Sequence, residues 1–185
     1  MAITERRMSL QAFLELPEEE PALEFDDGVV TQKVSPQGKH SILTYRLAER
    51  FNRFAEPRQL AFAFPELRTT FADFSPVPDI AIYRWERIPR DSDGTVANRF
   101  VEPPDLAIEI VSPQQSVTSL VRKCLRFVER GVPIVLLIDP GDESVLRFGP
   151  SADVQVLRGA DPIDLSEVLP GFELTAQAVF DLLHL

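Results

Sequence analysis

The chain has 185 residues, of which 44% are hydrophobic and 26% are charged. This is enough for one globular domain with its own core, and we predict a single domain over residues 1–185. No run approaches the roughly 18 apolar residues of a membrane span, and no apolar segment follows Arg6 and Arg7, so we expect neither a membrane helix nor a secretory signal. The net charge of −10 argues against a broadly basic surface for nucleic acid.

Cysteine usage points to a reducing compartment. Cys124 is the single cysteine of the sequence, which excludes an internal disulfide and a cysteine zinc site. We therefore predict a cytoplasmic protein. Cys124 falls in the middle of an apolar helical arc, where we expect an inert core residue rather than a reactive thiol.

The N-terminal part predicts a short helix followed by a β-hairpin. The helix is expected over 9–16, with Ser9 as its N-cap. Extended segments at 23–25 and 29–34 flank an Asp-Asp-Gly sequence, and Asp-Gly readily adopts the positive φ values of a tight turn.

A long helix is predicted next, over 35–54. Its apolar stripe consists of Leu43, Leu47, Phe51 and Phe54. His40 falls on the same stripe, in the first turn. A lone histidine there is either a satisfied core residue or a group that contacts phosphate or water. A role as a metal ligand is not favoured, because the sequence has no second histidine nearby.

Two apolar strands each carry one acid. Residues 78–83 place Asp79 on one face of their strand, and residues 104–111 place Glu109 among apolar neighbours of theirs. An unpaired buried charge is costly, so a cation or a proton must accompany Glu109. Two carboxylates aimed to the same side of a sheet form an oxygen-rich pocket of the kind that holds Mg²⁺ or Mn²⁺.

A lysine on the following helix can reach these acids. On a helix over 115–130, Lys123 lies just outside the apolar arc, so its stem can follow the buried surface while its ammonium group approaches the carboxylates. In metal-assisted phosphodiester hydrolysis such a lysine would orient water or offset charge on the phosphate. The alternative is an ion-paired core in which Glu109 binds Lys123 alone.

The rest of the chain alternates strands and turns and ends in a helix. Further strands are predicted at 59–64, 67–71, 134–138, 144–148 and 154–157, a short extended piece at 162–165, and a closing helix at 176–183. The polar segment 84–99 predicts a surface loop that either selects substrate or is a linker without a role.

The order of these motifs resembles the PD-(D/E)XK nuclease superfamily, the fold of many restriction endonucleases. The usual lysine two residues after the glutamate is replaced by Val111, and Lys123 on the helix takes its place. With the lysine there, the pattern is similar to the Uma-type domain, a large bacterial family of "putative restriction endonucleases" long described as of unknown function. The matching motifs are LEFDDG at 23–28, SPQGKH at 35–40, PDI at 78–80, PDLAIEIVSP at 104–113 and GVPIVLLIDP at 131–140.

The resemblance implies a restriction-endonuclease-like α/β fold, a central mixed β-sheet flanked by helices, with an N-terminal helix and hairpin. It implies a metal-dependent endonuclease with Asp79, Glu109 and the Ile110 carbonyl oxygen around Mg²⁺ or Mn²⁺, and Lys123 beside them. Glu24 and His40 are expected near the same acids, although Glu24 could equally be a polar edge-strand residue. Nucleic acid, DNA in particular, is the expected substrate, and the chain is expected to form a homodimer.

Two features favour other interpretations. Family members often carry an aspartate four residues before the lysine, where this chain has Ser119. Together with the acidic composition, this favours a non-catalytic module that keeps the fold and binds nucleic acid or a protein. Arginines on two predicted helices are either a basic rim or solvated helix faces: Arg46, Arg50, Arg53, Arg122 and Arg126.

Overall fold

The structure of the chain is a computed structural model that describes residues 6–113, 115–150 and 153–185. The elements, in chain order, are β1 (Arg6–Arg7), α1 (Leu10–Leu14), β2 (Leu23–Asp26), β3 (Val29–Gln32), α2 (Gly38–Ala55), η1 (Glu56–Arg58), β4 (Ala61–Pro65), β5 (Phe74–Ser75), β6 (Ile80–Arg84), η2 (Trp85–Arg87), β7 (Leu106–Ile110), α3 (Val117–Glu129), β8 (Ile134–Asp139), β9 (Ser144–Phe148), β10 (Val154–Arg158), α4 (Ala176–Phe180) and η3 (Asp181–Leu183). Among the described helices, none is both long and apolar enough to cross a membrane.

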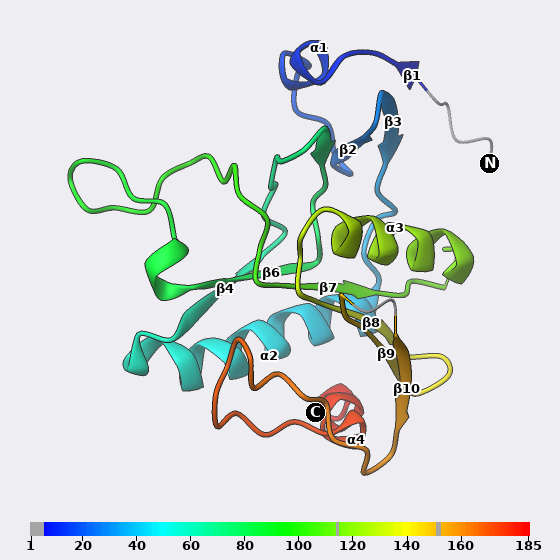
Figure 1. Cartoon of the computed structure of the whole chain (residues 1–185). Coiled ribbons are helices and arrows are strands. Elements are labelled where there is room, and N and C mark those ends of the chain that lie inside the picture. Colours follow the sequence, from blue (N-terminus) through cyan, green and yellow to red (C-terminus); the bar gives the residue numbers. More distant parts are fainter. Residues whose placement is uncertain (1–5, 114, 151–152) are drawn as a thin grey trace.

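Six strands form the central sheet, in the order β10-β9-β8-β7-β6-β4. Strands β7 and β8 run parallel, and the other neighbours are antiparallel. The middle strands β6, β7 and β8 are almost entirely buried, as expected for a sheet covered by helices on both faces. The predicted mixed sheet flanked by helices is confirmed (Figure 1).

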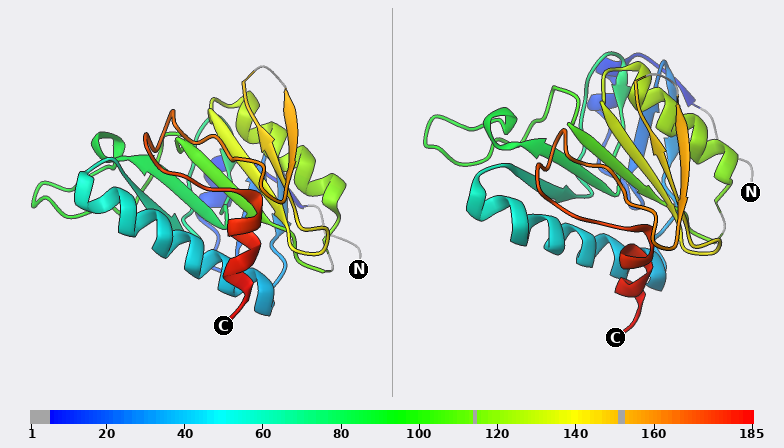
Figure 2. Two further views of the ribbon diagram at one scale, coloured as in Figure 1. Left: turned by 90° about the horizontal axis from the view of Figure 1, so that it is seen from below. Right: turned by 60° about the horizontal axis from the view of Figure 1, so that its bottom comes forward.

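The two faces of the sheet pack against different helices. Helix α3 covers one face, and α2 and α4 cover the other (Figures 1 and 2). Within β7, Ile108 belongs to the core cluster that includes α2, and Ala107 belongs to the cluster that includes α3. Because side chains alternate along a strand, Glu109 shares the side of Ala107 and faces α3.

A second, four-stranded antiparallel sheet lies beside the first and has the order β1-β3-β2-β5 (Figure 1). It contains the predicted hairpin, whose turn residues Asp27 and Gly28 have φ values of 47° and 87°. Ser9 caps α1 as predicted, accepting a hydrogen bond from the Ala12 N–H at 3.2 Å. Strand β5 pairs with β2 and continues through residues 76–79 into β6, which ties the small sheet to the central one.

The predicted strand at 67–71 is wrong. Thr69 and Phe71 form only isolated bridges. Phe71 pairs back onto Phe74 across a turn in which Ala72 and Asp73 have φ values of 46° and 54°. This reversal ends the extended segment before a ladder can form. The short extended piece predicted at 162–165 contributes one bridge, between Pro162 and Thr175.

Two of the five arginines proposed as a basic rim, Arg46 and Arg50, contact the C-terminal part of the fold. Arg46 Nη1 donates to the carbonyl oxygens of Leu182 and His184, at 2.8 and 2.7 Å. Arg50 lies over the ring of Phe172, 5.9 Å from its centroid. These contacts hold the C-terminal segment on α2. Helix α2 begins at Gly38 rather than at the predicted Ser35. Both arginines remain half-buried, so the basic rim stays a prediction.

Candidate active site

Polar side chains from both sheets and two helices converge at the end of β7. They are Glu24 of β2, Lys33 after β3, His40 in the first turn of α2, Glu66 after β4, Asp79 before β6, Glu109 of β7 and Lys123 of α3. The network brings together five residues singled out in the sequence, namely Glu24, His40, Asp79, Glu109 and Lys123. Sequence reasoning missed Lys33 and Glu66.

Asp79 lies at the centre of the network and is only 2% exposed. Its Oδ1 accepts a hydrogen bond from Lys33 Nζ at 2.7 Å. Its Oδ2 accepts one from the Ile110 N–H at 2.7 Å and lies 2.9 Å from His40 Nε2. Burial would raise the pKa of this carboxyl, but the hydrogen bond with His40 and the charge of Lys33 hold the pKa well below its usual range. Asp79 is therefore ionised at neutral pH.

Lys123 forms the other half of the network. Its Nζ lies 2.7 Å from Glu24 Oε1 and 2.7 Å from Glu109 Oε1. Burial would lower the pKa of this ammonium group, but Glu109, Glu24 and Asp79 together raise the pKa above its ordinary value. Lys123 thus remains a cation, held between an acid of the small sheet and an acid of the central sheet.

Glu109 is the least satisfied of these acids. Its Oε1 forms an ion pair with Lys123 Nζ at 2.7 Å, and among the described residues no other group donates a hydrogen bond to this buried oxygen. Burial, together with the nearby carboxylates of Asp79 and Glu24, raises the pKa of Glu109 to about 8 in spite of Lys123. A further positive charge, or a proton, is what this oxygen lacks.

The small sheet positions the peptide that precedes Asp79. Glu24 Oε1 accepts a hydrogen bond from the Val77 N–H at 2.7 Å, and Lys33 Nζ donates to the Val77 carbonyl oxygen at 2.9 Å. The hairpin therefore holds both polar groups of Val77, two residues before Asp79. This is why a segment without regular structure can deliver a buried carboxylate to a fixed place.

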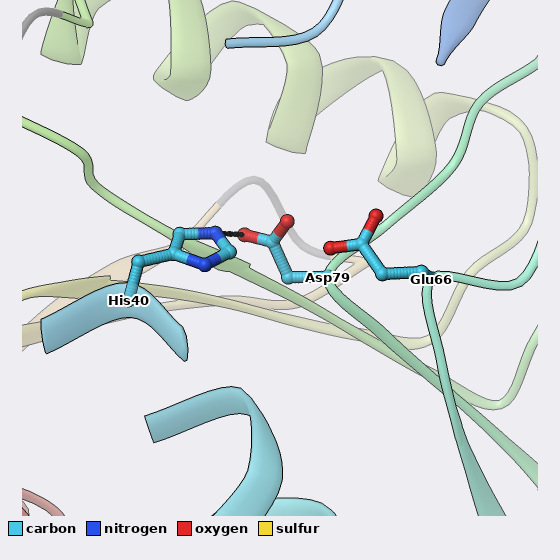
Figure 3. A group of neighbouring side chains, drawn as sticks. All are labelled: His40, Glu66 and Asp79. Atoms are coloured by element: carbon cyan, nitrogen blue, oxygen red, sulfur yellow. Dashed lines mark ion pairs between the residues drawn. The ribbon is translucent and has the colours of Figure 1, made fainter. Parts of the chain in front are cut away.

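Three of the residues form a group with the spacing of metal ligands. One ligand atom each from His40, Glu66 and Asp79 lies within 4.8 Å of the others, and Asp79 stands between the other two (Figure 3). Lys33 Nζ lies 2.8 Å from Glu66 Oε2 and so bridges Glu66 and Asp79. Burial raises the pKa of Glu66, whereas Asp79 and Glu109 raise that of Lys33 against the effect of burial.

The charges of the network leave room for a divalent cation. The ion pairs join four carboxylates and two ammonium groups, which gives a net charge of −2 when every carboxyl is ionised and His40 is neutral, and of −1 while Glu109 keeps its proton. Hard oxygen ligands with net negative charge are what Mg²⁺ and Mn²⁺ prefer. The excess of carboxylates is compatible with such an ion, and among the described residues the group with ligand spacing is His40, Glu66 and Asp79.

A pocket of about 430 Å³ opens beside His40. Its walls are the start of α2, the turn after β7 and the turn after β8, and the residues are Gln37, Gly38, Lys39, His40, Val111, Ser112, Pro113, Asp139, Pro140 and Gly141. The parallel strands β7 and β8 end at the same edge of the sheet, which is why their following turns share a wall. His40 lines this pocket and contacts Asp79, so the pocket borders the Asp79 side of the network.

Comparison with known families identifies the chain. The sequence matches the Uma2 family, described as "putative restriction endonuclease", over residues 10–177. The chain belongs to the Uma2 family.

A solved structure agrees with this assignment. The crystal structure of a "putative nuclease belonging to DUF820" from Anabaena variabilis superposes with a TM-score of 0.91 at 38% sequence identity, covering 95% of this chain and 99% of that one. A search of curated proteins finds no match. Both the family and the solved structure support a nuclease whose substrate is nucleic acid.

Lys33 and Glu66 carried no signal within the Uma2 motifs. Lys33 precedes the SPQGKH motif and looks like a solvated residue after a hairpin, and Glu66 looks like part of a Pro-Glu connector. The one hint is position, since each directly follows a strand, and the strand before Glu66 pairs with β6 beside Asp79. Glu66 has a φ of 50°, in the left-handed region, and its N–H donates to the Asp79 carbonyl oxygen at 3.1 Å. Strained backbone of this kind is common at functional sites.

Proposed function

We propose that the chain is a Mg²⁺-dependent endonuclease that hydrolyses phosphodiester bonds of DNA. The observation that carries this proposal is the buried Glu109 oxygen, paired with Lys123, beside the ionised Asp79, in a network of four carboxylates and only two ammonium groups. A structural ion-paired core would not need this excess of acid. The family and the Anabaena structure support the same class of activity.

The ion would be held by Asp79 and Glu109, with the Ile110 carbonyl oxygen as a predicted further ligand. When bound, Mg²⁺ supplies a Lewis acid that lowers the pKa of water and offsets charge on the phosphate. The N–H of Ile110 donates to Asp79 and fixes the orientation of that carboxylate. His40 holds the same Asp79 oxygen from the α2 side, so its proposed role is to position the ligand.

Lys123 is the proposed catalytic cation. Its ammonium group lies between Glu24 and Glu109, where it would orient the attacking water or donate a hydrogen bond to the phosphate. Glu24 keeps Lys123 in place and anchors the Val77 peptide at the same time. Glu24 is therefore assigned a positioning role.

The pocket beside His40 is the proposed place for the substrate backbone. Its wall contains the first turn of the 18-residue helix α2 and the exposed Lys39. The first turn of a helix presents backbone N–H groups to an anion, and lysine binds phosphate as a point charge. By resemblance we further propose a homodimer, which sedimentation analysis of the purified chain would test.

Metal binding and nicking test the proposal together. Calorimetry with Mn²⁺ should detect binding to the wild-type chain. Asp79→Ala should abolish this binding, because it removes one of the two carboxylates proposed to hold the ion. Plasmid nicking in Mg²⁺ should fall by about 10²–10³-fold in Lys123→Met, the usual effect of removing one stabilising group at a reacting centre. Glu49→Gln, which removes an exposed acid of α2, should change neither measurement.

Failure of the first measurement would favour a different class of protein. A wild-type chain that binds no Mn²⁺ at millimolar concentration fits the non-catalytic binding module. Ser119 is exposed at the start of α3 and brings no carboxylate to the network, which is the specific observation behind this second candidate.

A further inference from the structure

The Lys33 ammonium group is enclosed by oxygen atoms. Its three acceptors are Asp79 Oδ1 at 2.7 Å, Glu66 Oε2 at 2.8 Å and the Val77 carbonyl oxygen at 2.9 Å. They match the three N–H donors of an ammonium group. Only 9% of the Lys33 side chain is exposed, so the contact is built into the fold rather than made at the surface.

This cage of oxygens is rigidly framed. The Lys33 N–H donates to the Ala22 carbonyl oxygen at 2.9 Å, which fixes the chain as it leaves β3. The left-handed backbone of Glu66 and its hydrogen bond to the Asp79 carbonyl oxygen fix the opposite wall. Two strands that are distant in sequence therefore hold a cation position between them.

The same cage has the donors of a divalent metal site. His40, Glu66 and Asp79 each offer a ligand atom within 4.8 Å of the others. An ion bound by Glu66 and Asp79 at about 2.1 Å would overlap the position that Lys33 Nζ now fills at 2.8 and 2.7 Å from them. Two cations cannot share that space, because their repulsion in a partly buried site is large.

We propose that Lys33 is the resident cation of a second metal-type position formed by His40, Glu66 and Asp79, and that its ammonium group keeps a second divalent ion out. The wild-type chain then binds one ion per chain, at Asp79 and Glu109. This inference rests on the proposed function for that first ion. It adds that Lys33 takes the place of the second ion of a two-metal arrangement, in which both ions would share Asp79.

Counting bound Mn²⁺ tests the proposal. Electron paramagnetic resonance of free Mn²⁺ and calorimetry should give one ion per wild-type chain, two per Lys33→Met chain, and one again in Lys33→Met combined with Glu66→Gln. Lys39→Met removes an exposed lysine near the same site and should leave the count at one. Glu66→Gln alone should also leave it at one.

Thermal melting covers the possibility that Lys33→Met weakens the fold. Mn²⁺ should raise the Tm of Lys33→Met more than that of the wild-type chain, and adding Glu66→Gln should remove the difference. The proposal is overturned if Lys33→Met gains no ion and no extra Tm shift, or if Glu66→Gln removes the wild-type ion. If the wild-type chain binds no Mn²⁺, the metal dependence of the proposed function fails, whereas a Glu66-dependent ion gained by Lys33→Met would still support the role of Lys33.

Discussion

Glu109 couples the stability of the fold to pH. Its pKa is raised to about 8 from an ordinary value of 4.5, first by burial and then by the neighbouring acids. The folded chain therefore binds this proton more tightly than the unfolded chain. The stability from Glu109 is fully present below pH 4.5 and is lost as the pH rises through about 8.

Replacing Glu109 should flatten this dependence. We expect the free energy of unfolding of the wild-type chain to fall between pH 5 and pH 8 more steeply than that of Glu109→Gln, because glutamine carries no titratable proton. Each pH unit between the folded and unfolded pKa is worth about 1.4 kcal/mol. Urea unfolding in EDTA measures the two curves. Parallel curves would contradict the assigned pKa, and Glu49→Gln should follow the wild type.

Lys123 should matter for stability as well as for chemistry. Lys123→Met leaves Glu24 and Glu109 without their shared cation, and breaking a buried ion pair from one side costs about 3–5 kcal/mol. We expect a loss near the lower end, since Glu109 can accept a proton. Chemical denaturation should show the loss, and Glu109→Gln in the same chain should restore part of it. A comparable loss in Arg122→Met, at the exposed neighbouring position, would show that the effect is not specific.

At the scale of elements, helix α3 positions Lys123 beside Glu24 and Glu109, because capping interactions fix both ends of the helix. Ser116 caps the N-terminus, accepting a hydrogen bond from the Ser119 N–H at 3.4 Å. Gly131 follows the C-cap residue Arg130 and has a φ of 92°, a conformation that L side chains rarely adopt. A short helix with fixed ends holds Lys123 in register with β2 and β7.

Substitutions at two glycines distinguish the effect of backbone conformation on stability from the effect of packing. Gly131→Ala should cost about 1 kcal/mol because of its positive φ, although nothing lies within 4 Å of the added Cβ. Gly38→Ala, at the first residue of α2, also meets open space but does not have such a φ, so it should be neutral or stabilise by up to about 1 kcal/mol. Thermal unfolding of both variants checks the contrast. If both variants changed the thermal stability equally, the loss in Gly131→Ala would not come from the positive φ of Gly131.

At the scale of the whole molecule, the net charge of −10 opposes the approach of a polyanion. Of the three arginines of α2, Arg46 and Arg50 hydrogen-bond to the C-terminal segment, and only Arg53 is exposed. The network itself adds to this negative charge, because it joins four carboxylates to two ammonium groups. DNA binding should therefore depend on the metal ion.

Binding of a short phosphorothioate duplex, which resists cleavage, measures this dependence. At constant ionic strength the affinity in millimolar Mg²⁺ should exceed that in EDTA at least about tenfold, a difference of about 1.4 kcal/mol. Fluorescence anisotropy gives both affinities. Asp79→Ala should lose the difference, and equal affinities of the wild-type chain with and without Mg²⁺ would contradict a role of the ion in recognition.

The sequence by itself determined the fold class and which face of each strand its acid occupies. Strand alternation is local, so Asp79 and Glu109 could be assigned to one side of the sheet, and helical periodicity placed Lys123 at the edge of the apolar arc. Turn and cap signals at Ser9 and Gly28 were equally local. The strand predicted at 67–71 failed because propensity was outweighed by a chain reversal at Ala72 and Asp73.

Only the tertiary structure decided which cations meet which acids. Lys33 and Asp79 are 46 residues apart, and Lys123 and Glu24 are 99 apart. Such contacts depend on how the hairpin sheet packs against the central sheet, and no periodicity within one segment encodes that packing. The position of Lys33 between two acids is the clearest case, because its neighbours in the sequence are exposed while its ammonium group is enclosed.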